Sequence, residues 1–140
     1  MITELENAKQ HLIAGGYTCV LCKDQDIHTS FERGVKPLLM LLESGKNFKG
    51  YSAADKVIGK ATAFLYVMLG VKAVYAKVIS RSALQVLKEN NIYVENDITA
   101  ENIINRAGDG ICPFESAVLD IKDIDIAYKT ILQRVQVMRK

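Results

Sequence analysis

Two short segments of the chain contain residue types that nucleophilic and proton-transfer chemistry require. The first runs from Ala53 to Lys56 and contains Asp55; the second runs from residue 111 to 115 and contains Cys112 and Glu115. A carboxyl group can act as a general acid or base. A thiol just before a helix start is more reactive, because the helix dipole favours the thiolate. Asp55, Cys112 and Glu115 are therefore the candidate catalytic residues.

Each of these residues also has a purely structural interpretation. Ser52 is a good N-cap, and Asp55 three places later nearly completes a capping box at a predicted helix start. Glu115 can be simply an acidic residue in the first turn of a helix, where it interacts favourably with the helix dipole. Cys112 can be an inert, half-buried thiol. The sequence leaves both interpretations open for all three.

Basic residues near the same segments predict contacts with an anion. Two helix starts that face one crevice would present free N–H groups and positive dipole ends, which favour a phosphate or carboxylate. On a helix that begins near Ser52, Lys56 and Lys60 would lie one turn apart and add charge, unless they are only solvated surface. Arg33 could bind the anion at the rim, and Gly34 would permit close backbone approach.

Composition restricts the classes of protein that the chain can represent. The 140 residues are 49% hydrophobic and 24% charged with a net charge of +2, which fits one globular domain over residues 1–140. The low charge and the lack of a basic, aromatic-rich stretch argue against nucleic acid as a partner. The first residues do not resemble a signal peptide and no apolar run could span a bilayer, so we expect a cytoplasmic protein without a membrane partner.

Cys19 and Cys22 have the spacing of a metal or redox motif, but their context argues against that function. They lie in a β-rich run from residue 17 to 22. Positions three apart on a strand point to opposite faces of the sheet. We therefore expect two small buried side chains rather than a chelating pair.

Strands alternate with helices after an initial hairpin, which predicts a three-layer α/β/α sandwich with a mixed sheet. Apolar spacing predicts helices over 2–14, 35–42, 53–69, 82–89, 100–105, 115–119 and 124–138, and strands over 17–22, 27–32, 73–79 and 92–94.

This order of elements resembles the cytidine deaminase-like fold. The segments 33–38, 55–61 and 110–115 are similar to those of an uncharacterised prokaryotic family of unknown function in that superfamily. In cytidine deaminases a His or Cys at one helix start and two cysteines at another hold zinc. Aligned with that pattern, this chain has Ala53, Cys112 and Glu115 at the ligand positions. Alanine cannot bind a metal, so the resemblance implies a domain without zinc or another cofactor.

Three hypotheses about function follow. The first is a non-zinc deaminase-fold domain that binds a small anionic, nucleotide-like ligand in a regulatory or accessory role. The second is an enzyme that uses Cys112 as a nucleophile or sulfur carrier, with Asp55 or Glu115 transferring protons. The third is a homo-oligomerising structural module without a ligand. The sequence does not name the ligand.

Overall fold

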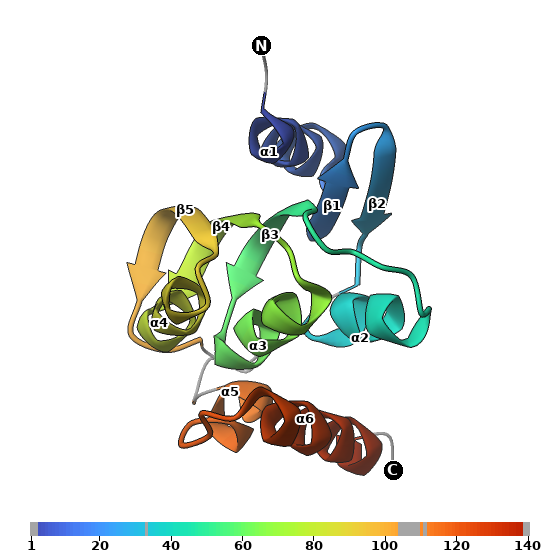
Figure 1. The fold of residues 1–140 in the computed structure, drawn as a ribbon. Helices are drawn as coiled ribbons and strands as arrows, with labels where there is room; N and C mark the ends of the chain where they lie inside the picture. The colour runs from blue at the N-terminus through green and yellow to red at the C-terminus, as the bar shows by residue number, and fades with distance from the viewer. Residues whose placement is uncertain (1–2, 33, 104–109, 111, 139–140) are drawn as a thin grey trace.

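The molecule is built around a mixed five-stranded sheet (Figure 1). The structure, a computed structural model, describes residues 3–32, 34–103, 110 and 112–138. The strand order is β2-β1-β3-β4-β5, in which β1 is antiparallel to β2 and β3, and β3, β4 and β5 are parallel. The strands are β1 (Cys19–Lys23), β2 (Asp26–Ser30), β3 (Ser52–Ile58), β4 (Ala73–Ser80) and β5 (Tyr93–Ala100).

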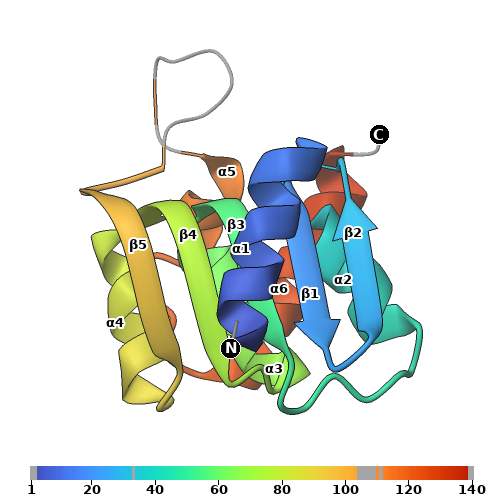
Figure 2. The ribbon, with the colours of Figure 1, turned by 90° about the horizontal axis from the view of Figure 1, so that it is seen from above.

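Helices cover both faces of this sheet, which confirms the predicted three-layer α/β/α sandwich. Helix α1 (Glu4–Gly15) lies on one face, and α2 (Lys36–Glu43), α3 (Lys60–Leu69) and α4 (Arg81–Glu89) lie on the other (Figure 2). The short α5 (Pro113–Ala117) and the long α6 (Ile124–Met138) pack on the outer side of α3.

The position of α3 between the sheet and α6 explains why it is buried on nearly all sides. Seven of its side chains are buried, among them the large Phe64 and Tyr66. A helix that is covered all round requires apolar residues on every face, not on a single stripe. The prediction of a central, buried helix in this region is therefore confirmed.

The predicted start of that helix at Ala53, with Ser52 as its N-cap, is wrong. Ser52–Ile58 forms the central strand β3, and α3 begins only at Lys60, after Gly59 in an extended conformation. Ser52 and Asp55 imitate a capping box, but pairing with β1 on one side and β4 on the other satisfies the backbone groups of this segment. Neither residue therefore caps a helix.

Two further elements near the C-terminal end of the sheet differ from the prediction. Strand β5 continues to Ala100, well beyond the predicted end at Val94, because its backbone pairs with β4 along its whole length. The predicted helix over 100–105 does not form at residues 100–103, and residues 104–105 lie outside the described part of the chain. The hairpin, α1, α2, β4, α4 and α6 lie close to where the sequence predicted them.

The two strand cysteines face opposite sides of the sheet, as predicted. Cys19 belongs to the core beneath α2 and α3, whereas Cys22 belongs to the core beneath α1. Both thiols are free.

Candidate functional site

Asp55 is a buried carboxyl group near the middle of the molecule. Its side chain is 8% exposed and points from β3 toward α3, where its Oδ2 accepts a 2.7 Å hydrogen bond from the Tyr66 hydroxyl. Its Oδ1 accepts a 3.2 Å bond from the backbone N–H of Val57. Burial raises the pKa of Asp55 to about 7, and the hydrogen bonds from Tyr66 and from the backbone only partly oppose that rise.

The Tyr66 hydroxyl connects Asp55 to a cysteine. The Cys19 sulfur lies 3.3 Å from the Tyr66 oxygen, and both side chains are buried. Burial, and then the nearby Asp55 charge, raise the pKa of the Cys19 thiol well above its ordinary value. Asp55, Tyr66 and Cys19 therefore form a continuous chain of proton-exchanging groups, which we call the Asp55 chain.

Sequence reasoning missed two of these three residues. Tyr66 has the helical spacing of a core residue, and Cys19 reads as a small buried hydrophobe. The pairing of β1 with β3 sets Cys19 opposite Asp55, and α3 places Tyr66 over both. A polar hydroxyl among apolar helix positions was the one signal in the sequence.

Glu115 is buried at a second place, where α3 and α4 begin. It is 2% exposed, and its Oε2 accepts a short hydrogen bond from the backbone N–H of Lys60, in the first turn of α3. Its Oε1 accepts a 3.3 Å bond from the hydroxyl of Ser82, in the first turn of α4. The carboxylate thus bridges two helix starts at the carboxyl ends of β3 and β4.

Gly59 makes room for this carboxylate. A Cβ at position 59 would lie 2.5 Å from the Glu115 Oε2 and 3.2 Å from the Ile103 Cγ1. Carbon and oxygen atoms cannot approach that closely without displacement, so the absence of a side chain here is a packing requirement.

The two lysines do not lie on one helix, which corrects that prediction. Lys56 is exposed on β3, whereas Lys60 opens α3. The Lys60 ammonium donates a 2.7 Å hydrogen bond to the backbone carbonyl of Leu119, between α5 and α6. Lys60 therefore lies beside Glu115, whereas Lys56 forms no described hydrogen bond with Glu115 or its partners.

Cys112 lies at the start of α5, as predicted from its proline context, and it is half-buried. Its backbone N–H donates a 2.8 Å bond to the carbonyl of Ile103, and α5 begins at Pro113. Its sulfur forms no hydrogen bond with another described residue. Helix α5 has only five residues, so any dipole effect on this thiol is small.

Gly34 has a left-handed backbone conformation that favours glycine. Its φ is +68°, and no atom lies within 4 Å of the Cβ that another residue would carry there. That Gly34 permits close backbone approach to a ligand stays a prediction. Arg33, the predicted anion ligand at the rim, lies outside the described residues.

The predicted site residues therefore divide between two places. Asp55 contacts Tyr66 and the backbone of Val57, while Glu115 contacts Lys60 and Ser82, so the two carboxylates share no partner. Among the described residues, no three His, Cys, Asp or Glu side chains are grouped so that they could hold a metal ion. Within the same residues, no helix is both long and apolar enough to cross a membrane.

Comparison with known proteins identifies the family. The model of the TM1506 family, a domain of unknown function (DUF1893), matches residues 7–135. The chain belongs to the DUF1893 family. A crystal structure of a DUF1893 protein (TM1506) from Thermotoga maritima superimposes with a TM-score of 0.86 at 26% identity, over 93% of this chain and 88% of that one. No curated protein matches the sequence.

A second solved structure is much less similar to this DUF1893 domain. A diaminohydroxyphosphoribosylaminopyrimidine deaminase/5-amino-6-(5-phosphoribosylamino)uracil reductase from Thermotoga maritima matches with a TM-score of 0.43 and 14% identity, over 81% of this chain and 38% of that one. The sequence alignment placed Ala53 at a helix start, where cytidine deaminases have their first zinc ligand. That placement is wrong, because Ala53 lies inside strand β3.

Proposed function

We propose that this DUF1893 domain binds a small anionic, nucleotide-like ligand at the carboxyl ends of β3 and β4, in a regulatory or accessory role. The observation that carries the proposal is the Glu115 carboxylate, which sits on the Lys60 N–H at the start of α3. The protein's own carboxylate occupies the position that the anionic group of a ligand would take. We call this place the Glu115 site.

The chemistry around the carboxylate suits an oxyanion. The first N–H groups of a helix have no partner within the helix, and the helix dipole makes that end positive. The neighbouring helix α4 adds hydroxyl groups: Ser80 caps its start through the Ala83 N–H at 3.2 Å, and Ser82 donates to Glu115. Ligands of open α/β sheets commonly bind outside the carboxyl ends of parallel strands.

Binding would require Glu115 to leave, which connects the ligand to the position of α5. Glu115 is in the first turn of α5, so an anion that replaces it breaks the main polar contact between α5 and the starts of α3 and α4. The Lys60 ammonium, held by the Leu119 carbonyl, lies on the same helix start and supplies positive charge. Ligand binding would thus change the position of α5 and of the adjoining α6. A conformational change of this kind is typical of a regulatory domain.

Removal of the Glu115 carboxylate tests the proposal. We expect Glu115→Ala to lower the free energy of unfolding by about 2–3 kcal/mol, because hydrogen bonds to a charged group are lost. Acetate, inorganic phosphate or a nucleoside monophosphate should then restore part of the melting temperature of the variant. The wild type, whose site is filled by its own carboxylate, should respond much less. Thermal unfolding against increasing anion concentration, with chloride at equal ionic strength, measures both effects.

Two control variants separate site occupancy from general salt effects. Glu101→Ala removes a carboxylate that is 73% exposed and paired with Arg81, so anions should not rescue it. Glu115→Gln keeps the shape of the side chain and should respond to anions less than Glu115→Ala does. Equal responses of Glu115→Ala and Glu101→Ala to every anion in the panel would contradict the proposed site.

A further inference from the structure

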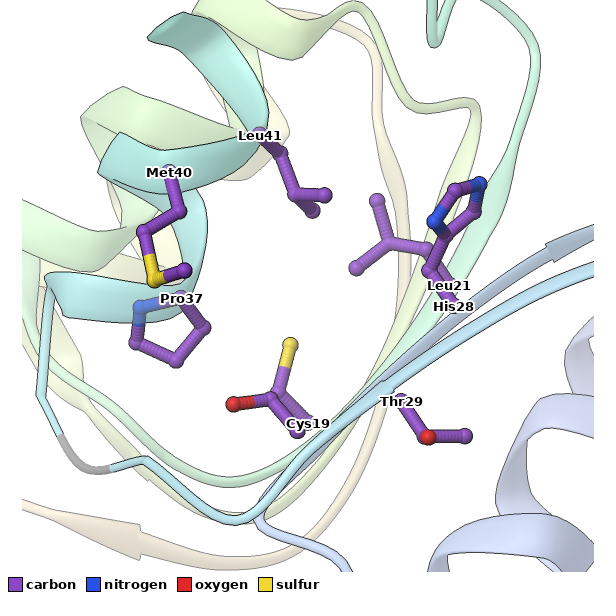
Figure 3. Close-up of a pocket in the computed structure, with 8 residues that line it drawn as sticks. Cys19, Leu21, His28, Thr29, Pro37, Met40 and Leu41 are labelled. Carbon is purple, nitrogen blue, oxygen red and sulfur yellow. The ribbon is translucent and has the colours of Figure 1, made fainter. Parts of the chain in front are cut away.

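A small cavity lies between α2 and the β1–β2 hairpin, away from the Glu115 site (Figure 3). Its volume is about 110 Å³. Its walls are mainly apolar and include Leu21, Pro37, Met40 and Leu41. The Cys19 sulfur points into it from β1 (Figure 3). The cavity therefore brings solvent-sized molecules to a thiol that the rest of the core covers.

The same sulfur is also the outer end of the Asp55 chain. The Tyr66 hydroxyl has one proton and donates it to Asp55 at 2.7 Å, so its oxygen is free to accept the Cys19 S–H at 3.3 Å. The thiol proton is thus directed toward Tyr66, and a sulfur lone pair remains for the cavity. Cys19 is thus connected through the Tyr66 hydroxyl to a carboxylate that can accept its proton. A nucleophile connected in this way to a base is an activated nucleophile.

His28 also lines the cavity, but it is not placed to act as the base. Strand pairing sets His28 opposite Leu21 and sets Cys19 opposite Ser30. The His28 Nε2 is 3.0 Å from the Asp26 carboxylate and 3.1 Å from the Lys46 ammonium. The ring is therefore held outward, at the edge of the hairpin, and Figure 3 shows it directed away from the Cys19 sulfur.

We propose that Cys19 is a thiol-exchange site for small uncharged sulfur electrophiles, such as an alkyl disulfide or thiosulfonate, and that Asp55 receives its proton through Tyr66. In this step the Cys19 sulfur forms a new S–S bond to the electrophile. The electrophile's own S–S bond breaks, and the leaving sulfur departs with the electron pair. The Cys19 proton moves to the Tyr66 oxygen as the Tyr66 proton moves to the Asp55 carboxylate.

The energetics of the core favour this direction of proton transfer. In the unreacted protein the thiol is not ionised in advance, because burial and the Asp55 charge oppose a thiolate. An ionised carboxylate without a positive partner is costly in the core, and protonation removes that cost. Burial therefore makes Asp55 a stronger base. The modified protein contains a neutral carboxyl and a neutral disulfide.

The cavity restricts the reagent to small, uncharged molecules. One water needs about 10–15 Å³ of such cavity volume, so about 110 Å³ has room for a small molecule of several non-hydrogen atoms. Its mostly apolar walls and the buried negative charge at the other end of the Asp55 chain disfavour an anion. A methylthio group fits these limits, and a charged peptide disulfide does not.

Two other cysteines of the chain provide internal controls. Cys22 is buried three residues away in the same strand but faces α1, where its sulfur donates to the Glu4 carbonyl at 3.1 Å. Cys112 is half-buried near the surface. Treatment of the full chain with methyl methanethiosulfonate, followed by peptide mass spectrometry over time, gives a separate rate for each thiol.

We expect Cys112 to react first, Cys19 next and Cys22 much more slowly. Oxidised glutathione, which is large and charged, should modify Cys112 and spare Cys19. Asp55→Asn removes the proton acceptor and should slow Cys19 by at least about tenfold, as expected for loss of a general base. Tyr66→Phe should have a similar effect, and neither variant should change the rate of Cys112.

Two results would overturn the proposal. Equal rates for Cys19 and Cys22 would mean that both react only through unfolding of the core. An unchanged or increased Cys19 rate in both Asp55→Asn and Tyr66→Phe, with folding verified by circular dichroism, would mean that the Asp55 chain takes no part in the reaction.

Discussion

Asp55 and Glu115 are both buried carboxyl groups on the same side of the sheet, but their surroundings differ. Glu115 accepts hydrogen bonds from a backbone N–H at a helix start and from a serine hydroxyl, and a lysine begins the same helix. Asp55 accepts hydrogen bonds from a phenol and a strand N–H, and no cation is hydrogen-bonded to it among the described residues. A helix start offers positive potential, whereas the centre of a sheet offers none.

This difference shows that burial alone does not decide what a carboxyl group can do. At the Glu115 site a backbone N–H at a helix start and a serine hydroxyl hold the protein's own carboxylate. At Asp55 the fold supplies hydrogen-bond donors but no positive charge that is hydrogen-bonded to the carboxylate among the described residues. Burial therefore raises the pKa of Asp55 to about 7, and the group can take up a proton near neutral pH. The first arrangement suits binding, and the second suits proton transfer.

The pH dependence of stability should reveal the cost of the Asp55 charge. The pKa of Asp55 rises from 3.8 to about 7 on folding, so between these pH values the folded state binds more protons than the unfolded state. This group's contribution to the free energy of unfolding therefore falls by about 4 kcal/mol as the pH rises through that window. Asp55→Asn should abolish this fall and be the more stable protein at pH 8.

Urea denaturation at several pH values measures this effect. The control is Glu101→Gln, which changes an exposed carboxylate and should leave the slope unchanged. The free energy of unfolding of the wild type should fall between pH 4 and pH 7 relative to that of Asp55→Asn. If it does not fall, the pKa of Asp55 is not raised by burial, and the difference between the two carboxyl groups is contradicted.

Removal of the Tyr66 hydroxyl should make the contrast sharper. Tyr66→Phe takes a donor from Asp55, which should cost about 2–3 kcal/mol at pH 8, where the carboxyl is charged, and about 1 kcal/mol at pH 5. The matched control is Tyr75→Phe, because the Tyr75 hydroxyl donates to Asp97 at 2.6 Å and Asp97 is exposed to water. Its cost should be similar at the two pH values. A pH-independent cost for Tyr66→Phe would mean that its hydroxyl does not stabilise the Asp55 charge.

A substitution at Gly59 should test whether Glu115 is packed against the start of α3. We expect a smaller change in the free energy of unfolding than for Tyr66→Phe. Gly59→Ala introduces a Cβ against the carboxylate and should cost about 1–3 kcal/mol through displacement of neighbouring atoms. In a Glu115→Ala background the cost should be smaller, because the 2.5 Å approach to the Glu115 Oε2 is removed. A double-mutant cycle measured by urea denaturation isolates this coupling. Strict additivity of the two substitutions would show that Glu115 does not occupy the space beside Gly59.

Much of the fold could be predicted from local patterns. The glycine pair at the end of α1, the apolar spacing of α2, α4 and α6, and the hairpin before residue 32 all have local causes. The positions of these elements were therefore predicted nearly correctly. The opposite orientation of Cys19 and Cys22 follows from the alternation of a strand and was predicted for that reason. The segment at Ser52 failed because capping signals and strand pairing compete there, and only the partner strands decide which prevails.

The candidate sites depended on contacts between residues distant in the chain. By itself the sequence determined that Asp55, Cys112 and Glu115 are unusual residues, that the strands and helices alternate, and that one helix after residue 52 is central. Only the tertiary structure decided that Glu115 reaches the start of α3, 55 residues earlier. Only the tertiary structure likewise decided that the Asp55 chain connects Asp55 through Tyr66 to Cys19. The physical reason is that propensity and spacing act over a few neighbouring residues, whereas burial and hydrogen-bond partners are set by how the layers pack.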